Sequence, residues 1–200
     1  MIRIRLNLQE SWIPLFRPLL EKGVVIETAT GCTVRDFLCN ELGLCSDYLD
    51  RRVQTLFLDG RPVDDPDRAM VTDGATVALS AAMPGLLGAT MRKAGRYAAM
   101  RESISGSEPA CGICQKSGRV TVKLFNFVAR EFGLHLLQRG VEVDGTALQQ
   151  IVDRGPADLS RTLYRAYLDQ QATRPMDDHG PDLSGGRVWL SVSVAPIVAG

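Results

Sequence analysis

The chain has little histidine and no excess of charge of either sign. Two of its 200 residues are histidines, and 23 basic residues balance 23 acidic ones. A formal net charge of zero provides no overall field that would draw the whole chain to nucleic acid or to an anionic membrane. No apolar run approaches the roughly 18 residues of a membrane span, and charges interrupt the first apolar run, MIRIRLNLQ. We therefore expect a cytoplasmic protein without signal peptide, membrane span or nucleic-acid partner.

The sequence also lacks the common catalytic patterns. It has no glycine-rich loop that would cradle a phosphate and no arrangement of Ser, His and Asp that would suggest nucleophilic catalysis. His135 lies in an apolar run and His179 in a polar one, and neither has a nucleophile nearby. The acidic groups around Asp65 and Asp178 fit polar turns better than a cation site. We expect a protein that is not itself an enzyme.

The stretch from Val53 to Gly85 has the clearest pattern of strands and turns. Thr55–Leu58 has strand composition, and Asp59-Gly60 is a dipeptide that supplies positive φ angles in a tight turn. After a second Asp-Gly at Asp73-Gly74, Val77 and Leu79 alternate with small or polar neighbours, as in another strand.

The residues before this stretch complete a first domain. The N-terminal segment alternates between apolar and polar residues, which predicts a strand buried on one face, with Ile2, Ile4, Leu6 and Leu8 pointing inward. Residues 11–23 contain two prolines and predict a covered loop or a broken helical turn. Val24–Ile26 predicts a second strand that ends at Gly31. Thr33 followed by Asp36 is typical of a helix start, and the apolar face of that helix carries Val34, Phe37, Leu38 and Leu42.

The second half of the chain repeats features of the first in the same order. Val120, Val122 and Leu124 begin another alternating strand, and Thr146 with Gln149 repeats the helix start. Further correspondences link LLEKGV with LLQRGV, RPVDD with RPMDD, and the strand after Gly74 with the strand after Gly186. Residues 159–171 fit either a helix or a strand, and their assignment stays open.

The order of strand, Asp-Gly, RPVDD, a polar crossover, Asp-Gly, strand and small-residue tail resembles the end of the ubiquitin-like sulfur-carrier proteins, the MoaD/ThiS family. The second repeat is similar to the same family through Val122–Phe125, through the segment AREFG, and through its closing strand and tail. The resemblance implies an α+β protein of two tandem β-grasp domains, each a mixed sheet with one main helix across it. We expect domains at 1–85 and 119–200, joined by a basic, Gly/Ala/Ser-rich linker at 86–118.

The same resemblance implies a working C-terminal tail. In the family, an E1-like adenylating enzyme activates the carboxylate of a terminal Gly-Gly, and sulfur or an amine then attacks the acyl group. Gly85 is followed by Leu86, so the first domain offers no free carboxylate without cleavage. The printed sequence ends at Ala199-Gly200, which makes Gly200 the expected carrier residue, although Ala199 departs from the double glycine. The implied partners are the E1-like adenylating enzyme, with a conjugating enzyme, a target protein or a cofactor-biosynthesis enzyme after it.

Cys111 and Cys114 form a CxxC pair in the linker, and their role stays open. Two thiolates at this spacing can bind a metal such as zinc, can form a redox pair, or can be plain loop residues. A structural zinc site normally has four ligands, and the chain has no second CxxC. We therefore expect no cofactor, with zinc as an alternative. The odd number of cysteines, five, suggests a reducing compartment, with Cys32 and Cys39 as small buried apolar residues.

Two functions remain in view. The first is a ubiquitin-like or sulfur-carrier-like protein that works through Gly200. The second is an interaction scaffold of the same fold that lacks carrier chemistry and binds partners through its sheet faces and linker, with metal bound at the CxxC as a variant.

Overall fold

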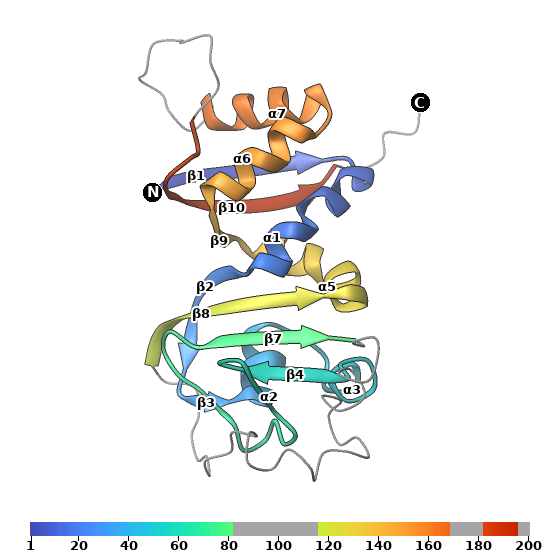
Figure 1. Cartoon of the computed structure of the whole chain (residues 1–200), viewed down its shortest axis with the longest axis vertical. Coiled ribbons are helices and arrows are strands. Elements are labelled where there is room, and N and C mark those ends of the chain that lie inside the picture. The colour runs from blue at the N-terminus through green and yellow to red at the C-terminus, as the bar shows by residue number, and fades with distance from the viewer. Residues whose placement is uncertain (82–115, 169–181, 196–200) are drawn as a thin grey trace. The chain divides into compact units, whose positions relative to one another are not determined.

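The computed structural model describes residues 1–81, 116–168 and 182–195 and has α+β architecture with mixed strand pairing (Figure 1). Its contacts divide the chain into two compact units. The first unit consists of Met1–Val24 and Gly133–Gly200, and the second unit is the continuous segment Val25–Phe132. Most of the predicted linker at 86–118 lies outside the described residues.

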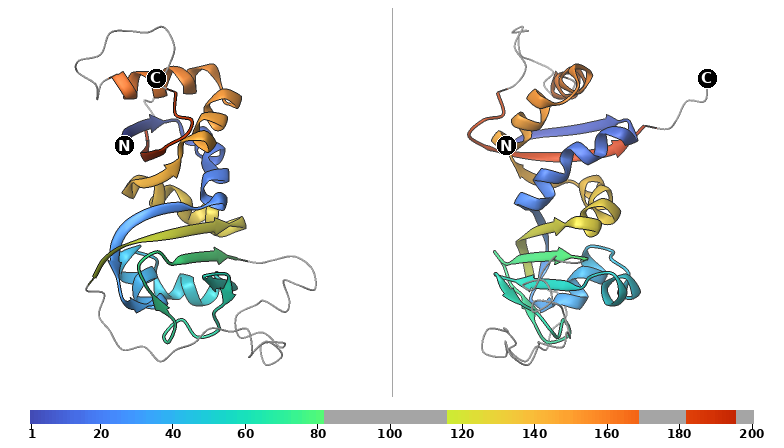
Figure 2. Two further views of the ribbon diagram at one scale, coloured as in Figure 1. Left: turned by 60° about the vertical axis from the view of Figure 1, so that its left-hand side comes forward. Right: turned by 45° about the vertical axis from the view of Figure 1, so that its right-hand side comes forward.

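The first unit has three strands in the order β1-β10-β9. β1 runs parallel to β10, with Ile2 opposite Val188 and Leu8 opposite Val194, and β10 runs antiparallel to β9. α7 lies beside β1 in both figures, and α6 packs against β9, α1 and η1 (Figures 1 and 2). The elements in chain order are β1 (Ile2–Leu8), η1 (Glu10–Phe16), α1 (Arg17–Lys22), β9 (Val141–Asp144), α6 (Gly145–Arg154), α7 (Ala157–Leu168) and β10 (Arg187–Val194).

Alternation along the strands builds the core of this unit. On β1 and β10 every second residue is buried, and the buried set comprises Ile4, Leu6, Leu8, Val188, Leu190 and Val192. Removing each such side chain from water stabilises the fold by about 1.5–3 kcal/mol before the cost in chain entropy. The helices complete the burial with Leu148, Val152, Leu159 and Leu163.

The second unit has five main strands in the order β2-β8-β7-β4-β5. β7 lies between a parallel partner, β8, and an antiparallel partner, β4. β3 and β6 form a separate antiparallel pair. The elements are β2 (Val24–Thr30), β3 (Cys32–Thr33), α2 (Val34–Asp36), the π-helical turn η2 (Phe37–Glu41), α3 (Ser46–Arg51), β4 (Thr55–Leu58), β5 (Arg61–Pro62), β6 (Met70–Val71), β7 (Thr76–Ser80) and β8 (Lys116–Phe125). α5 (Asn126–Arg139) begins in this unit and continues into the first.

Several local predictions are confirmed here. Asp59 and Gly60 both have positive φ, 51° and 78°, as the tight turn between β4 and β5 requires. The Asp59 carboxylate also accepts a hydrogen bond from the Thr76 amide at 2.7 Å. The Thr33 hydroxyl accepts the Asp36 amide and caps the helix start, although that helix continues as a π-helical turn.

Other elements differ from the sequence-based expectation or resolve it. The open assignment at 159–171 is a helix as far as it is described, because α7 covers Ala157–Leu168. The second predicted helix is capped by Asp144, whose carboxylate accepts the Ala147 amide, so Thr146 lies inside the helix. β8 begins at Lys116, inside the segment expected to be linker.

The first compact unit combines both ends of the chain, and the second lies between them in the sequence. The predicted domains, 1–85 and 119–200, are instead two successive segments. The difference has one cause. The first strand of the chain pairs with its last strand, and the pair β7 and β8 is joined by residues 81–115. β1, from the first half of the chain, is thus the parallel partner of β10 in the second half. β8, from the second half, is the parallel partner of β7 in the first half.

A polar contact links α3 to α5 within the second unit. The Tyr48 hydroxyl donates to the Glu131 carboxylate at 2.7 Å, and Arg52 pairs with the same carboxylate. These contacts, first that from Tyr48, lower the pKa of Glu131 below its usual value of 4.5. Burial and the bond to Glu131 raise the pKa of Tyr48.

We expect Glu131→Gln to lower the melting temperature at pH 7 and to flatten its dependence on pH below about 4.5. A carboxyl whose folded pKa is depressed stabilises the fold above its unfolded pKa, and that contribution is lost as the pH falls through the folded value. The measurement is thermal unfolding from pH 7 to pH 3. Glu27→Gln, on an exposed position of β2, is the control. Identical pH profiles for wild type and Glu131→Gln would contradict the link.

We also expect the fragment 24–132 to fold and the fragment 1–85 not to fold as a monomer. The first contains all five main strands of the second unit, whereas the second lacks β8, the parallel partner of β7. Amide dispersion in NMR spectra and cooperative thermal unfolding distinguish the cases. A cooperatively folded monomeric 1–85, with 24–132 unfolded, would support the sequential domains instead.

Candidate functional site

The residues singled out from the sequence, Ala199, Gly200, Cys111 and Cys114, all lie outside the described residues. The structure does describe how the chain reaches the tail. β10 is the middle strand of its unit and stays in register with β1 to Val194, opposite Leu8. The amide of Ala195 then donates to the Leu8 carbonyl at 2.9 Å. The chain is therefore held by backbone bonds up to the residue that precedes 196–200.

β1 and β10 present a polar face opposite their buried face, and we call it the β1–β10 face. The register places Arg3 opposite Trp189, Arg5 opposite Ser191 and Asn7 opposite Ser193. Because side chains alternate along a strand, these residues share one side of the sheet. Trp189 and Ser191 are half-buried, and the others are exposed. The members of this face are Arg3, Arg5, Asn7, Arg187, Trp189, Ser191 and Ser193.

Trp189 is the fixed centre of the β1–β10 face. The guanidinium carbons of Arg3 and Arg5 lie 5.5 and 5.7 Å from the centroid of its ring, within the range of cation–π attraction. Gly140, with φ of 89°, follows α5 and lies so close that a Cβ there would overlap Cζ2 of the indole. The Ser191 hydroxyl donates to the Gln138 carbonyl at 3.2 Å. The ring thus holds two arginine side chains on one face of the sheet.

The charge of this face is positive. Arg187 pairs with Glu142, whose carboxylate oxygen lies 3.6 Å from its Nε. Within the described ranges, Arg3 and Arg5 have no carboxylate within ion-pair distance, so their charges are not balanced locally. Two oriented guanidinium groups beside a tryptophan are suited to bind carboxylates or other anionic groups of a partner.

Sequence reasoning missed this face. Arg3 and Arg5 appear in the sequence only as the polar half of an alternating strand, and Trp189 lies far along the chain. Only the pairing of β1 with β10 brings them together. The alternation itself would have identified the two arginines as neighbours on one face.

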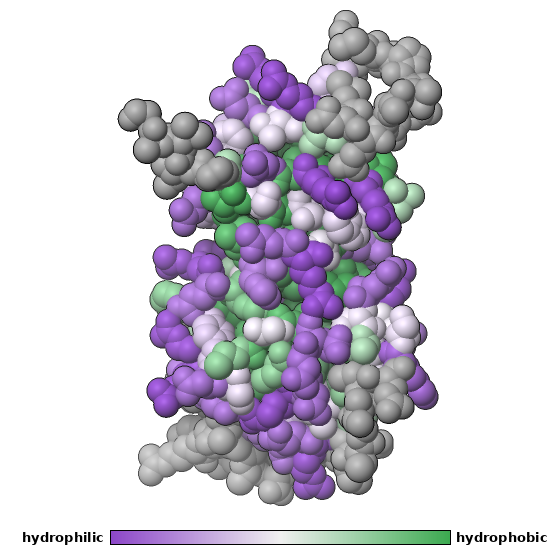
Figure 3. Space-filling view, turned by 180° about the vertical axis from the view of Figure 1, so that it is seen from behind, coloured by the Kyte–Doolittle hydropathy of each residue, from purple (hydrophilic) through white to green (hydrophobic). Residues whose placement is uncertain are grey.

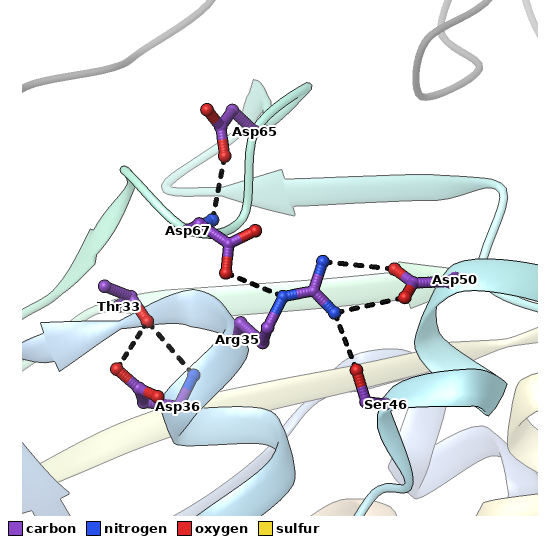
Figure 4. A network of polar contacts seen from close by, with 7 residues as sticks. All are labelled: Thr33, Arg35, Asp36, Ser46, Asp50, Asp65 and Asp67. Atoms are coloured by element: carbon purple, nitrogen blue, oxygen red, sulfur yellow. Dashed lines mark hydrogen bonds and ion pairs between the residues drawn. The ribbon is translucent and has the colours of Figure 1, made fainter.

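A second polar cluster surrounds Arg35 in the second unit (Figure 4). Its Nε lies 2.7 Å from Asp67, and its Nη2 lies 3.1 Å from Asp50, while Nη1 donates to the Ser46 hydroxyl at 2.9 Å. These carboxylates, Asp67 first, raise the pKa of Arg35 further above its usual value. Because the guanidinium is fully engaged, the cluster ties α2, α3 and the loop before β6 together. We assign it a structural role.

The acidic residues near this cluster behave as the polar turn residues that the sequence predicted. Asp65 accepts the Asp67 amide at 3.0 Å, which is the geometry of a local turn, and Asp67 is committed to Arg35. In 1–81, 116–168 and 182–195, no three His, Cys, Asp or Glu side chains lie together as a metal site. Asp177, Asp178 and His179 lie outside those ranges.

The cysteines differ from the expectation in two respects, because Cys39 is only half-buried and Cys32 forms a disulfide. Cys32 is fully buried, as predicted, but it is disulfide-bonded and lies on β3 rather than on the helix with Cys39. Cys39 and Cys45 are free. Burial raises the pKa of the Cys39 thiol, which disfavours the reactive thiolate. Disulfides are rare in reducing compartments, so the disulfide at Cys32 does not fit the compartment that the cysteine count suggested.

The surface of the described residues carries few large apolar side chains. Only Met1 and Phe127 among them are highly exposed, and Arg130 lies 5.6 Å from the Phe127 ring. Figure 3 shows one side of the molecule, on which apolar and hydrophilic residues are interspersed. None of the described helices combines the length and the apolar character needed to cross a membrane.

Comparisons with protein-family models, with curated proteins and with solved structures give no match for this chain. Function must therefore be argued from the residues and the geometry described here.

Gly140→Ala should destabilise the protein by about 1–3 kcal/mol more than Gly185→Ala, the range typical of an overpacked site. Both glycines have positive φ, 89° and 83°, so both variants carry a similar backbone strain, but only position 140 lies against Trp189. Urea unfolding followed by tryptophan fluorescence measures the difference. Equal losses in the two variants would mean that Trp189 does not pack against Gly140.

Proposed function

We propose that the chain is a ubiquitin-like or sulfur-carrier-like protein of two β-grasp halves, and that an E1-like adenylating enzyme activates the carboxylate of Gly200. In this reaction the carboxylate attacks the α-phosphorus of ATP and pyrophosphate leaves. A sulfur donor or an amine then attacks the acyl carbon, and AMP leaves. The chain supplies the acyl group and the recognition surface, while the chemistry belongs to the partner.

The strand pairing supports the interpretation that both halves have a β-grasp fold. In a β-grasp sheet the closing strand is central, parallel to an opening strand and antiparallel to a middle strand. β7 has this environment between β8 and β4, and β10 has it between β1 and β9. The recurrence of one local arrangement fits the repeats in the sequence. The two opening strands are exchanged between the halves, which the repeat pattern makes possible because both alternate in the same way.

The observation that carries the carrier proposal is the position of β10. A carrier tail must leave from a rigid point so that the terminal residues reach an active site while the fold stays outside it. β10 is central and is bonded to β1 through Ala195, and 196–200 follow directly. The final Ala199-Gly200 suits a narrow channel less well than a double glycine, because Ala199 carries a Cβ.

The β1–β10 face supplies the recognition surface in this proposal. Arg3 and Arg5 lie on the strand that flanks β10, opposite Trp189 and Ser191, so a partner that binds along this strand pair meets these arginines. An acidic patch on the adenylating enzyme would match them in charge and speed the encounter. The first half of the chain adds surface without a reactive end, since Gly85 continues into Leu86.

The interaction scaffold remains the second candidate because one observation favours it. The β1–β10 face is oriented by Trp189 whether or not the tail reacts, so it can bind an acidic partner without carrier chemistry. The carrier function requires Gly200 at the end of the chain, whereas the scaffold function predicts that a change there has no effect on partner binding.

Incubation with ATP and an E1-like enzyme encoded nearby should increase the intact mass of the C-terminal peptide, as adenylate, thiocarboxylate or conjugate. One residue added after Gly200 should abolish the increase, because it moves the carboxylate. Ala199→Gly should raise the rate, because it restores the double glycine. Arg3→Gln with Arg5→Gln should weaken enzyme binding and leave the fold intact.

Arg161→Gln, at an exposed position of α7, is the matched control for the arginine variants. The enzyme must first be shown to be active on another carrier. If that enzyme then gives no mass increase, or if the added residue has no effect, the carrier function is wrong and the scaffold stands.

A further inference from the structure

A groove lies in the first unit between the segment of η1 and α1 and the helix α6. Its volume is about 300 Å³, at the lower end of the range for small-molecule pockets. Both sides contribute apolar residues to its lining. The residues used below are Leu15, Pro18 and Lys22 on one side and Ala147, Ile151 and Arg154 on the other.

The groove arises from the spacing of small and rigid residues. Ala147, Ile151 and Arg154 are four and three residues apart, so they form one stripe along α6. The facing stripe is supplied by Leu15 and by Pro18 at the start of α1. α1 and η1 both contact α6, yet the methyl group of Ala147 and the compact ring of Pro18 are too short to fill the space between them.

The charges along the groove are unequal. At one end, the Lys22 ammonium lies 3.2 Å from the Asp144 carboxylate, which also accepts the Ala147 amide. These two contacts, the amide first, lower the pKa of Asp144, so the carboxylate stays ionised and balances Lys22. At the other end, Arg154 is exposed, and it has no carboxylate within ion-pair distance in the part of the chain that the structure describes. The unbalanced positive charge is at the Arg154 end.

We propose that this groove binds a free straight-chain monocarboxylate of medium length. The alkyl chain lies along Leu15, Pro18, Ala147 and Ile151, and the carboxylate meets the guanidinium of Arg154. A planar guanidinium fits a carboxylate through two parallel hydrogen bonds. The seven steps from Ala147 to Arg154 span about 10 Å at 1.5 Å per residue, which is close to the length of an eight-carbon chain. The inference is independent of the carrier function.

The chemistry of the groove distinguishes this ligand from two others. One turn of a partner helix, about 10 Å across and 5.4 Å long, occupies roughly 420 Å³, which is more than the groove holds. A short polar acid such as acetate would use Arg154 but would leave the apolar walls in contact with water. Both ends of the ligand are therefore needed, an apolar chain and one anionic group.

The test is a titration of the full chain with sodium octanoate, followed by amide shifts in ¹⁵N NMR spectra and by calorimetry. We expect saturable binding with the largest shifts along 147–155 and 15–22. Each methylene added between butyrate and octanoate should raise the affinity by up to about fourfold, the value for a fully buried methylene. Octanol, which has the chain without the charge, should bind about tenfold more weakly, as for the loss of one charge-assisted hydrogen bond.

Two variants address the two halves of the ligand. Arg154→Gln should reduce the affinity for octanoate about tenfold and leave that for octanol unchanged. Ala147→Leu should fill the groove and lower the affinity for octanoate and for octanol. If Ala147→Leu does not fold, Ile151→Ala takes its place. Arg161→Gln is the matched control, because this exposed arginine lies on α7 and pairs with Asp158.

The proposal is wrong if octanoate gives no saturable shifts, if octanol binds as tightly as octanoate, or if Arg154→Gln and Arg161→Gln lose affinity equally. None of these binding measurements uses ATP or an activating enzyme. Failure here is therefore distinguishable from failure of the carrier function, and each can stand without the other.

Discussion

The parallel pairing of β1 with β10 is the constraint on which the rest of the first unit depends. It joins the first strand of the chain to the last and buries Ile4, Leu6, Val188 and Leu190 on one side of the sheet. On the other side it brings Arg3 beside Trp189. Because pairing over so long a separation has a high cost in chain entropy, the apolar face must be well buried to offset it.

The same constraint unites the two candidate functions. β10 leads to residues 196–200 and also holds Trp189, so in both proposed functions the same strand is central. If the tail does not react, the face remains a binding surface.

Local chemistry was sufficient to predict several of the elements, but not how they pair. Alternation identified β1 and β8, Asp59-Gly60 identified its turn, and Thr33 identified its cap, because each depends on neighbours in the chain. Pairing was not predictable, since β1 and β8 alternate alike and either could lie beside β7 or β10. Asp144 displaced Thr146 as a cap because Gly145 already has helical geometry. The groove beside Ala147 depends on packing between helices, which no linear pattern records.

Cross-strand NOEs in the full chain test the central claim most directly, because they report pairing independently of any activity. The account predicts backbone contacts between Ile4 and Leu190, together with contacts between Val77 and Val122. Contacts between Ile4 and Val77, with Val122 beside Leu190, would show that each half closes on its own first strand. That result would contradict the exchange of strands and return the chain to two sequential domains.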